Sequence, residues 1–193
     1  MKVIDLKLFG PYKLLGNNNS FFDNDISKKN GIYLWTINYE NGYLVHYIGE
    51  TSRSFRIRMQ EHIINILGGY YGVWDPEMLK QGKLQFVWKG LWRKDSKENI
   101  NDYIDKYEKF APIFKKYLQV QSVFLAPLSV DKYLRRLIEG HMAKKIMEAP
   151  PPINNLLPTD NRYGYLYRKN DETLRIKFEC NENILGIPKE III

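Results

Sequence analysis

The sequence predicts an α+β fold, in which helices flank a small mixed or antiparallel β-sheet. Short strand-like apolar segments alternate with segments of helical periodicity. An Asn41-Gly42 step separates two of the strand-like segments, which is typical of a β-hairpin. No repeat, low-complexity tract or linker divides the chain, so we expect one domain over residues 1–193. Within it we expect a core at 31–67 and 119–155, an insertion with its own β and α segments at 68–118, and a β-rich extension at 156–193.

Composition excludes several classes of protein. Of the 193 residues, 44% are hydrophobic and 26% are charged, as in soluble globular proteins rather than disordered or membrane-spanning ones. The single Cys180 forms neither an intrachain disulfide nor a zinc cluster, which suits a reducing compartment. Asp5 stands where a signal peptide needs an apolar stretch. We therefore expect a cytoplasmic protein with no membrane partner.

The chain is basic and rich in aromatic residues. Its net charge is +7, and 14% of its residues are aromatic. A positive protein binds polyanions favourably because condensed counterions are released. Aromatic rings stack on bases, although most of them fill protein cores. Composition therefore permits a nucleic-acid partner without demonstrating one.

The first part of the predicted core is a hairpin followed by a helix. Residues 1–29 form a polar lead-in with a short apolar patch, and strands are expected at 31–37 and 43–48. Both central residues of an Asn-Gly hairpin turn need positive φ. A helix then follows Ser52 or Ser54, with Gly68-Gly69 at its end. Its apolar face is formed by Phe55, Met59, Ile63 and Leu67.

The insertion and the second part of the core have weaker patterns. We expect an irregular segment at 70–74, a strand at 84–92 and a helix at 100–118 that Pro112 kinks. A buried strand at 120–125 leads to a helix capped by Ser129, with Asp131 in its first turn. Prolines at 150–152 end that helix. Strands are expected in the extension at 163–167, 173–178 and 191–193.

Six polar residues stand out, and each has a simpler structural explanation when taken alone. A tyrosine in a strand usually packs with its hydroxyl satisfied. An arginine and a histidine one helical turn apart often lie on a solvated helix edge. A glutamate pairs readily with an arginine four residues earlier, and an asparagine after prolines commonly begins a turn. The six residues are Tyr33, Tyr47, Arg58, His62, Glu139 and Asn154, with Arg135 as the neighbour of Glu139.

Their order along the chain is more informative than any one of them. Gly31-Ile32-Tyr33 lies on the first hairpin strand and Tyr47-Ile48-Gly49 on the second. Arg58 and His62 follow on the helix, beside its apolar face. A polar pair at the margin of a buried face is well placed to line a groove.

The series continues in the second part of the core. Glu139 lies on the predicted helix after the buried strand, and Asn154 follows Pro151 by three positions. Asn155 has the same relation to Pro152 and is the alternative. Over Gly31–Asn155 the chain resembles the GIY-YIG nuclease superfamily, and its layout is similar to the stand-alone members that act as restriction endonucleases.

The resemblance implies a metal-dependent DNA endonuclease. Hydrolysis of a phosphodiester needs an activated water, a cation on the phosphate and relief of charge on the leaving oxygen. In such an enzyme Glu139 would hold a mostly hydrated Mg²⁺ (or Mn²⁺), and Arg58 would neutralise the phosphate. Tyr33 would be the general base and Tyr47 its hydrogen-bonding partner, although these two roles can be exchanged. His62 would orient the water or the phosphate, and Asn154 would hold the network in place.

Other residues complete the prediction. Glu50 stands where the superfamily commonly has a cation, which weakens the local positive field unless Arg53 and Arg56 compensate. DNA recognition would come from the insertion and the extension, and cutting both strands suggests a homodimer or sequential nicking. The predicted phosphate-binding residues are Arg53, Arg56, Arg135, Arg136, Lys144 and Lys145.

Two alternatives remain open from the sequence. A protein of the same fold that has lost its chemistry would bind DNA in a salt-sensitive manner without cutting it. An enzyme acting on RNA or on branched DNA would use the same phosphate chemistry, because the contacts that discriminate these substrates lie outside the six residues.

Overall fold

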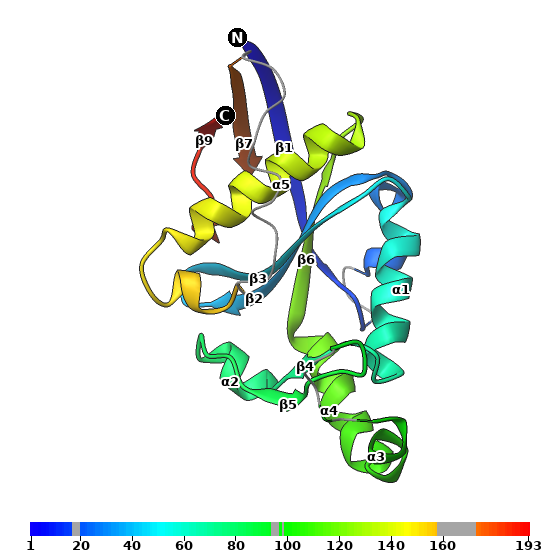
Figure 1. Ribbon diagram of the computed structural model, residues 1–193. Helices are drawn as coiled ribbons and strands as arrows, with labels where there is room; N and C mark the ends of the chain where they lie inside the picture. The colour runs from blue at the N-terminus through cyan, green and yellow to red at the C-terminus, as the bar shows by residue number, and fades with distance from the viewer. Residues whose placement is uncertain (17–19, 94–96, 98, 158–172) are drawn as a thin grey trace.

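The computed structural model describes residues 1–16, 20–93, 97, 99–157 and 173–193 (Figure 1). It confirms an α+β fold with one large mixed sheet and several helices. The strand order in the sheet is β8-β3-β2-β6-β1-β7-β9. The strands are β1 (Lys2–Lys13), β2 (Gly31–Tyr39), β3 (Gly42–Thr51), β6 (Gln121–Pro127), β7 (Leu174–Cys180), β8 (Ile184–Leu185) and β9 (Glu190–Ile192).

The sheet is larger than the sequence predicts because the lead-in belongs to it. β1 pairs antiparallel with β6 on one side and parallel with β7 on the other. Leu6 and Leu8 alternate inward and are buried, which makes the short apolar patch a half-buried strand. Pro11 is tolerated because the register with β6 shifts between Phe9 and Tyr12. The expectation of a polar lead-in was therefore wrong for this segment.

The predicted hairpin is confirmed, but its turn lies one residue earlier. Tyr39 pairs with Gly42, so Glu40 and Asn41 form the connection, and Glu40 has the positive φ of 46°. Burial explains the shift. Ile37 pairs with Leu44 and both are buried, and this inward packing sets the strand register and thereby the turn.

The two long helices of the core cover opposite faces of the sheet (Figure 1). Helix α1 (Phe55–Leu67) begins as predicted, with the Ser54 side chain accepting from the Ile57 amide. Helix α5 (Lys132–Met147) is capped by Asp131, whose carboxylate accepts from the Leu134 amide at 2.9 Å. The prediction of Ser129 as this cap was wrong. A carboxylate at the cap also interacts favourably with the helix dipole.

Alternation along β2 assigns side chains to the two faces. Tyr33 and Trp35 belong to the hydrophobic cluster that contains Met59 of α1. Ile32 and Leu34 belong to the other cluster, which contains residues of α5. Successive side chains of a strand point to opposite faces, so this division follows from the strand itself.

The insertion packs on the α1 side of the sheet and differs from its prediction in two places. The strand expected at 84–92 is only three residues long, and the helix expected at 100–118 is interrupted at Lys106 rather than at Pro112. Tyr103 before the interruption and Phe110 after it both pack on Trp88. The elements are β4 (Val73–Trp74), α2 (Pro76–Lys80), β5 (Phe86–Trp88), α3 (Ile100–Asp105) and α4 (Tyr107–Val120).

The remaining elements are short. The strands predicted at 173–178 and 191–193 are confirmed as β7 and β9, whereas β8 was not predicted. The strand predicted at 163–167 and the Gly16–Ser20 loop, except for its two ends, lie outside the described residues. Three 3₁₀ turns complete the described elements: η1 (Phe21–Asp23), η2 (Asp25–Lys28) and η3 (Ile153–Asn155).

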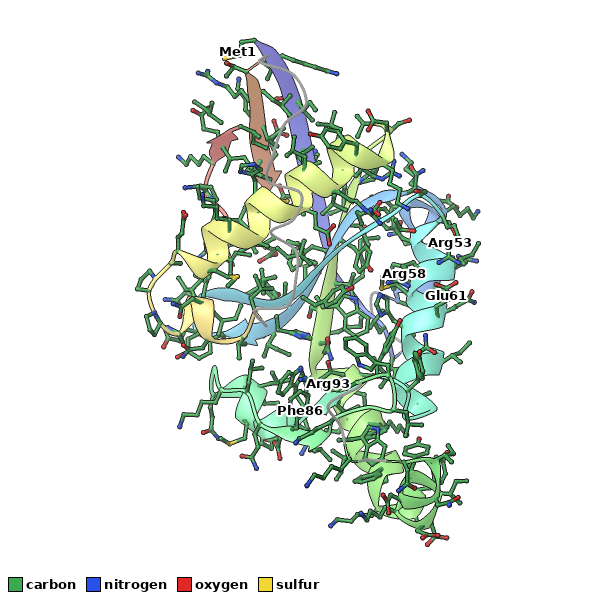
Figure 2. The ribbon with its side chains drawn as sticks, in the orientation of Figure 1. Met1, Arg53, Arg58, Glu61, Phe86 and Arg93 are labelled. Carbon is green, nitrogen blue, oxygen red and sulfur yellow. The ribbon has the colours of Figure 1, made fainter. Side chains whose placement is uncertain are left out.

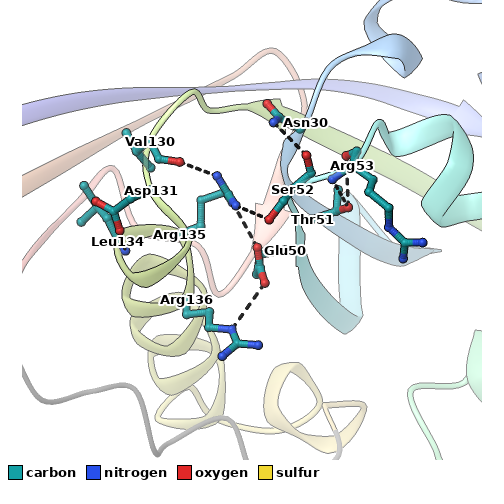
Figure 3. Close-up of polar contacts among 10 residues, drawn as sticks. All are labelled: Asn30, Glu50, Thr51, Ser52, Arg53, Val130, Asp131, Leu134, Arg135 and Arg136. Atoms are coloured by element: carbon teal, nitrogen blue, oxygen red, sulfur yellow. Dashed lines mark hydrogen bonds and ion pairs between the residues drawn. The ribbon is translucent and has the colours of Figure 1, made fainter.

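A buried ion pair joins the end of β3 to α5 (Figure 3). The Arg135 Nε donates to the Glu50 carboxylate at 3.1 Å and its Nη2 donates to the Ser52 hydroxyl at 2.6 Å. The third guanidinium nitrogen donates to the Val130 carbonyl oxygen. Arg136 contacts the other Glu50 oxygen at 3.4 Å. Glu50 is therefore neutralised by α5, and not by Arg53 and Arg56 as the sequence suggested.

We predict that Arg135→Met lowers the free energy of unfolding by about 3 kcal/mol, because it leaves the Glu50 carboxylate buried without its main partner. The side chain of Arg135 is 5% exposed and that of Arg136 is 34% exposed. Arg136→Met is the matched control and is expected to cost less than about 1 kcal/mol. Urea unfolding measures both, and equal losses would contradict the structural role of Arg135.

Candidate functional site

Tyr33, Arg58 and His62 form one hydrogen-bonded group between β2 and α1. The Tyr33 hydroxyl lies 2.9 Å from the Nε2 atom of His62, and the Arg58 Nε donates to the same hydroxyl at 3.1 Å. Because Arg58 can only donate, the Tyr33 oxygen accepts from it. The tautomer of His62 decides whether its Nε2 atom accepts from Tyr33 or donates to it. The structure thus brings together three of the six residues that the sequence predicted to form one site.

Two further tyrosines surround this group. The Tyr47 ring is stacked 6.0 Å from that of Tyr33 and lies 5.4 Å from the His62 ring, centroid to centroid. The Tyr71 ring lies 5.7 Å from His62. The sequence did not single out Tyr71, since it gives no pattern beyond the aromatic segment at 70–74. We call Tyr33, Tyr47, Arg58, His62 and Tyr71 the tyrosine cluster.

Charge within the cluster favours a neutral Tyr33 and a charged Arg58. Burial, with a further contribution from the neighbouring Tyr47 hydroxyl, raises the pKa of Tyr33 well above its usual value, and Arg58 only partly opposes this. Burial also disfavours the charged form of Arg58, but the phenolic oxygens of Tyr33, Tyr47 and Tyr71 outweigh it and raise the pKa of the guanidinium. A phenolate formed in this cluster would be stabilised by Arg58.

These properties argue against the predicted assignment of Tyr33 as the group that meets the attacking water. Tyr33 is completely buried, and its raised pKa keeps its proton in place at neutral pH. Tyr47 is partly exposed and hydrogen-bonds to Tyr33, so it is the better candidate for that contact. The exchange of roles between these tyrosines, left open by the sequence, is thus favoured by burial.

Arg58 is also held from the solvent side by Glu61 (Figure 2). The Glu61 carboxylate contacts Arg58 at 3.3 Å and accepts from Arg53 at 2.7 Å. Burial of Glu61 opposes its ionisation, but the hydrogen bonds from Arg53 and Arg58 outweigh this and lower its pKa. Glu61 therefore orients the guanidinium of Arg58, a role that the sequence did not predict for it.

A pocket of about 450 Å³ opens beside the tyrosine cluster. One wall comes from the sheet and α1 and includes Tyr47 and His62, while the opposite wall comes from the insertion. We call it the aromatic pocket because rings dominate its lining. It is lined by Trp35, His46, Tyr47, His62, Ile66, Tyr70, Tyr71, Gly72, Trp74, Phe86, Lys89, Trp92, Arg93 and Tyr117.

The structure does not place Glu139 and Asn154 with the other four predicted residues. Glu139 lies on α5, whose buried residues pack on the opposite face of the sheet from Tyr33. Asn154 lies in η3, after α5, and its Oδ1 atom is buried without a hydrogen-bond partner in the described part of the chain. Asn155 is exposed. The helix that carries Glu139 therefore covers the face of the sheet opposite to Tyr33.

The carboxylates in the described residues do not form a metal site around the tyrosines. No group of three or more His, Cys, Asp or Glu side chains that could hold a metal ion occurs in this part of the chain. Both oxygens of Glu61 are already bonded by arginines, and Glu139 is carried by the helix on the other face. A Mg²⁺ that relies on one carboxylate and on substrate phosphates needs no such group.

The predicted phosphate-binding residues fall into two sets. Arg135 and Arg56 serve the fold, because Arg56 donates to the Ser27 hydroxyl and to the Phe22 carbonyl oxygen. Arg53 is exposed and Arg136 is partly exposed, and each contacts a glutamate. Lys144 and Lys145 lie at the end of α5 and pair with Glu148. Arg135 therefore donates to buried acceptors of the protein itself and not to a phosphate.

Comparison of the chain with protein-family models, with curated proteins and with solved structures found no match. No helix in the described ranges is long and apolar enough to cross a membrane.

Gly49 provides a direct contact between the two predicted motifs, Gly31-Ile32-Tyr33 and Tyr47-Ile48-Gly49. Gly49 pairs with Tyr33 across the hairpin, and the Tyr33 ring lies over it. A Cβ atom at this position would come within 2.3 Å of both the Cζ and the hydroxyl oxygen of Tyr33. Only glycine therefore allows the Tyr33 hydroxyl to reach Arg58 and His62.

We predict that Gly49→Ala displaces Tyr33 and lowers the free energy of unfolding by about 1–3 kcal/mol, as overpacking of a core does. Gly68→Ala is the control, because its Cβ would meet only the Ile64 carbonyl oxygen, at 3.1 Å, and its expected effect is below about 1 kcal/mol. Urea unfolding and near-ultraviolet circular dichroism measure the two changes. A loss no larger than that of the control would refute the steric explanation.

The raised pKa of Tyr33 predicts a loss of stability at alkaline pH. Its pKa is higher in the folded chain than the value of about 10 in an unfolded one, so its contribution is complete below about pH 10 and is lost as pH rises towards the folded value. Tyr33→Phe should make the fall in unfolding free energy between about pH 9 and 11 shallower. The exposed Tyr107→Phe is the control, and identical slopes in the two variants would rule the prediction out.

Proposed function

We propose that the chain is a GIY-YIG-type nuclease that hydrolyses phosphodiester bonds in DNA. The observation that supports this most is the Tyr33 hydroxyl, which joins Arg58 to His62 beside an accessible Tyr47. A phosphoryl site needs a cation for the phosphate and a route for a proton, and this cluster offers both. The antiparallel order β3-β2-β6, with α1 between β3 and β6 in the chain, accords with the proposal.

Arg58 is proposed to bind the scissile phosphate. Its side chain is 24% exposed, and Glu61 and Tyr33 hold it from two sides. A planar guanidinium in a fixed orientation suits the oxygens of a phosphate. Little reorientation is then needed as negative charge develops during the reaction, which is the main source of electrostatic catalysis.

The tyrosines are proposed to carry the proton of the attacking water to His62. In the tautomer of His62 whose Nε2 is unprotonated, the water gives its proton to the Tyr47 oxygen, Tyr47 passes its own proton to Tyr33, and Tyr33 passes its proton to that Nε2 atom. The water oxygen forms its bond to phosphorus as the bond to the leaving oxygen breaks, and the leaving oxygen takes a proton from solvent. No phenolate has to persist, so the raised pKa of Tyr33 is no obstacle to this route.

The remaining features of the proposal come from the resemblance. They are a requirement for Mg²⁺ or Mn²⁺ with Glu139 as ligand, site-specific cutting of the restriction type, action as a homodimer, and a cytoplasmic location. The position of Glu139 on α5 means that substrate would have to reach around the sheet, or a partner would have to supply the ligand.

That same division of residues favours one alternative from another class. A DNA-binding protein of this fold without catalysis does not require Glu139 to approach Arg58, and it retains the basic charge and the aromatic pocket. It predicts binding that weakens with salt and does not lead to cutting.

The test is digestion of supercoiled plasmid DNA with Mg²⁺, Mn²⁺ or a chelator, together with RNA and branched DNA as further substrates. Discrete bands are expected for the parent protein with a divalent ion. Arg58→Met should slow cutting by about 10²–10³-fold, because it removes a donor to the charged phosphate. Arg175→Met is its matched control, because this partly exposed arginine of β7 pairs with Glu190 away from the site, and it should have only a small effect.

Two further variants separate the proposed roles. Tyr47→Phe should slow cutting at least as much as Tyr33→Phe, because Tyr47 contacts the water. Glu139→Ala is compared with Glu148→Ala, an exposed acid at the end of the same helix. Equal cutting by the parent and Glu139→Ala would exclude Glu139 as the metal ligand, and binding without cutting under every condition would establish the alternative.

A further inference from the structure

We infer that the aromatic pocket binds one unstacked nucleobase of a DNA strand, next to the phosphate held at the tyrosine cluster. The inference deepens the proposed function and rests on it for the identity of the ligand as DNA. The inference is based on the shape of the aromatic pocket and on the residues of the insertion that line it. The chemistry proposed for the tyrosine cluster does not by itself require these residues.

The wall formed by the insertion presents rings in a fixed arrangement. Trp74 and Phe86 are cross-strand partners in the β4–β5 pair, and their rings stack with centroids 3.6 Å apart and planes at 22°. The guanidinium carbon of Arg93 lies 5.5 Å from the centre of the Phe86 ring. Figure 2 shows Phe86 and Arg93 on the insertion, apart from Arg58 and Glu61 on α1. Planar groups held in this way offer a stacking surface to a base.

The rim of the pocket carries two large aromatic residues in contact with solvent. Tyr70 is 50% exposed and Trp92 is 48% exposed. The Trp92 amide donates to the Tyr70 carbonyl oxygen at 3.1 Å, so their backbones are held side by side. Rings that neither fill the core nor lie scattered over the surface, but gather at the mouth of a pocket, indicate a binding surface.

The backbone of the insertion is built to hold this rim. Gly90 has a φ of +91°, and a Cβ atom there would come within 2.8 Å of three backbone atoms of residues 70–72. The Trp88 indole donates to the Gly69 carbonyl oxygen at 2.7 Å and anchors the same crossing. The two chain segments therefore approach each other closely, and only glycine fits at position 90.

Charge and position identify the occupant as a nucleotide. The described residues that line the pocket include Lys89 and Arg93 and no Asp or Glu, which suits a ligand that carries phosphates. Tyr47 and His62 belong to both the pocket and the tyrosine cluster. A strand whose phosphate lies at Arg58 thus places a neighbouring base at the rings.

The base must be unstacked to enter. A base inside a duplex is covered on both faces, and enzymes reach such a base by turning it out of the stack into a pocket or by acting on a single strand. A pocket of about 450 Å³ falls within the range of small-ligand sites and is too small for a duplex. We therefore expect the protein to favour a single strand, or a duplex with a weakened pair, over a perfect duplex.

The experiment compares two short fluorescein-labelled DNA single strands, one unmodified and one with abasic sites at its centre. Both have the same phosphates, so any difference in Kd reports the bases. Binding is measured by fluorescence anisotropy with a chelator present. We expect the parent protein to bind the unmodified strand about ten-fold more tightly, and Tyr70→Ala and Trp92→Ala each to lose most of that preference.

Tyr107→Ala is the matched control, since Tyr107 is a 51% exposed aromatic residue of α4 that does not line the pocket. It should bind both strands as the parent does. Equal binding of the two strands by the parent, no binding of either strand, or a loss in Tyr107→Ala equal to that in Trp92→Ala would overturn the inference. Tighter binding of an RNA strand of the same sequence would overturn the assignment to DNA.

The chelator separates this result from the nuclease proposal. A preference for bases in a protein that never cuts DNA would leave the pocket assignment standing and contradict the proposed function. Cutting of DNA by a protein without this preference would support the proposed function and contradict the pocket assignment.

Discussion

The contact between the Tyr33 ring and Gly49 determines how the rest of the site is arranged. The ring occupies the space that a side chain at position 49 would need, and this brings its hydroxyl through the buried layer to α1. Arg58 and His62, one helical turn apart, then meet the same oxygen from two directions. A buried hydroxyl with a charged donor and an imidazole partner has its hydrogen-bonding capacity used within the protein.

The sheet separates the molecule into two faces with different polar interactions. On the α1 face, aromatic residues surround one guanidinium, and burial keeps the proton on Tyr33. On the α5 face, Glu50 and Arg135 form an ion pair that holds the helix against the end of β3. Glu50 thus has a structural role, and its negative charge is cancelled before it can weaken the field at the tyrosine cluster.

The insertion completes the α1 face rather than extending the sheet. Its rings continue the hydrophobic cluster that begins under Tyr33, and its outer rings form the mouth of the aromatic pocket. The same kind of residue therefore serves packing at depth and forms the proposed binding surface at the rim. Exposure distinguishes the two uses, since Trp88 is buried and anchors the chain crossing while Trp92 is half exposed.

Local patterns in the sequence predicted the hairpin, helix α1 and the proximity of Arg58 and His62, because strand alternation and helical periodicity are local properties. It missed β1 as a central strand, since the pairing of β1 with β6 and β7 joins residues far apart in the chain. Only the tertiary structure assigned Glu139 to the opposite face, removed Arg135 from the surface and added Tyr71 and Glu61 to the site. The burial of a side chain and its interaction partners depend on which segments pack together. The spacing of residues along one segment does not show which other segments pack against it across the sheet.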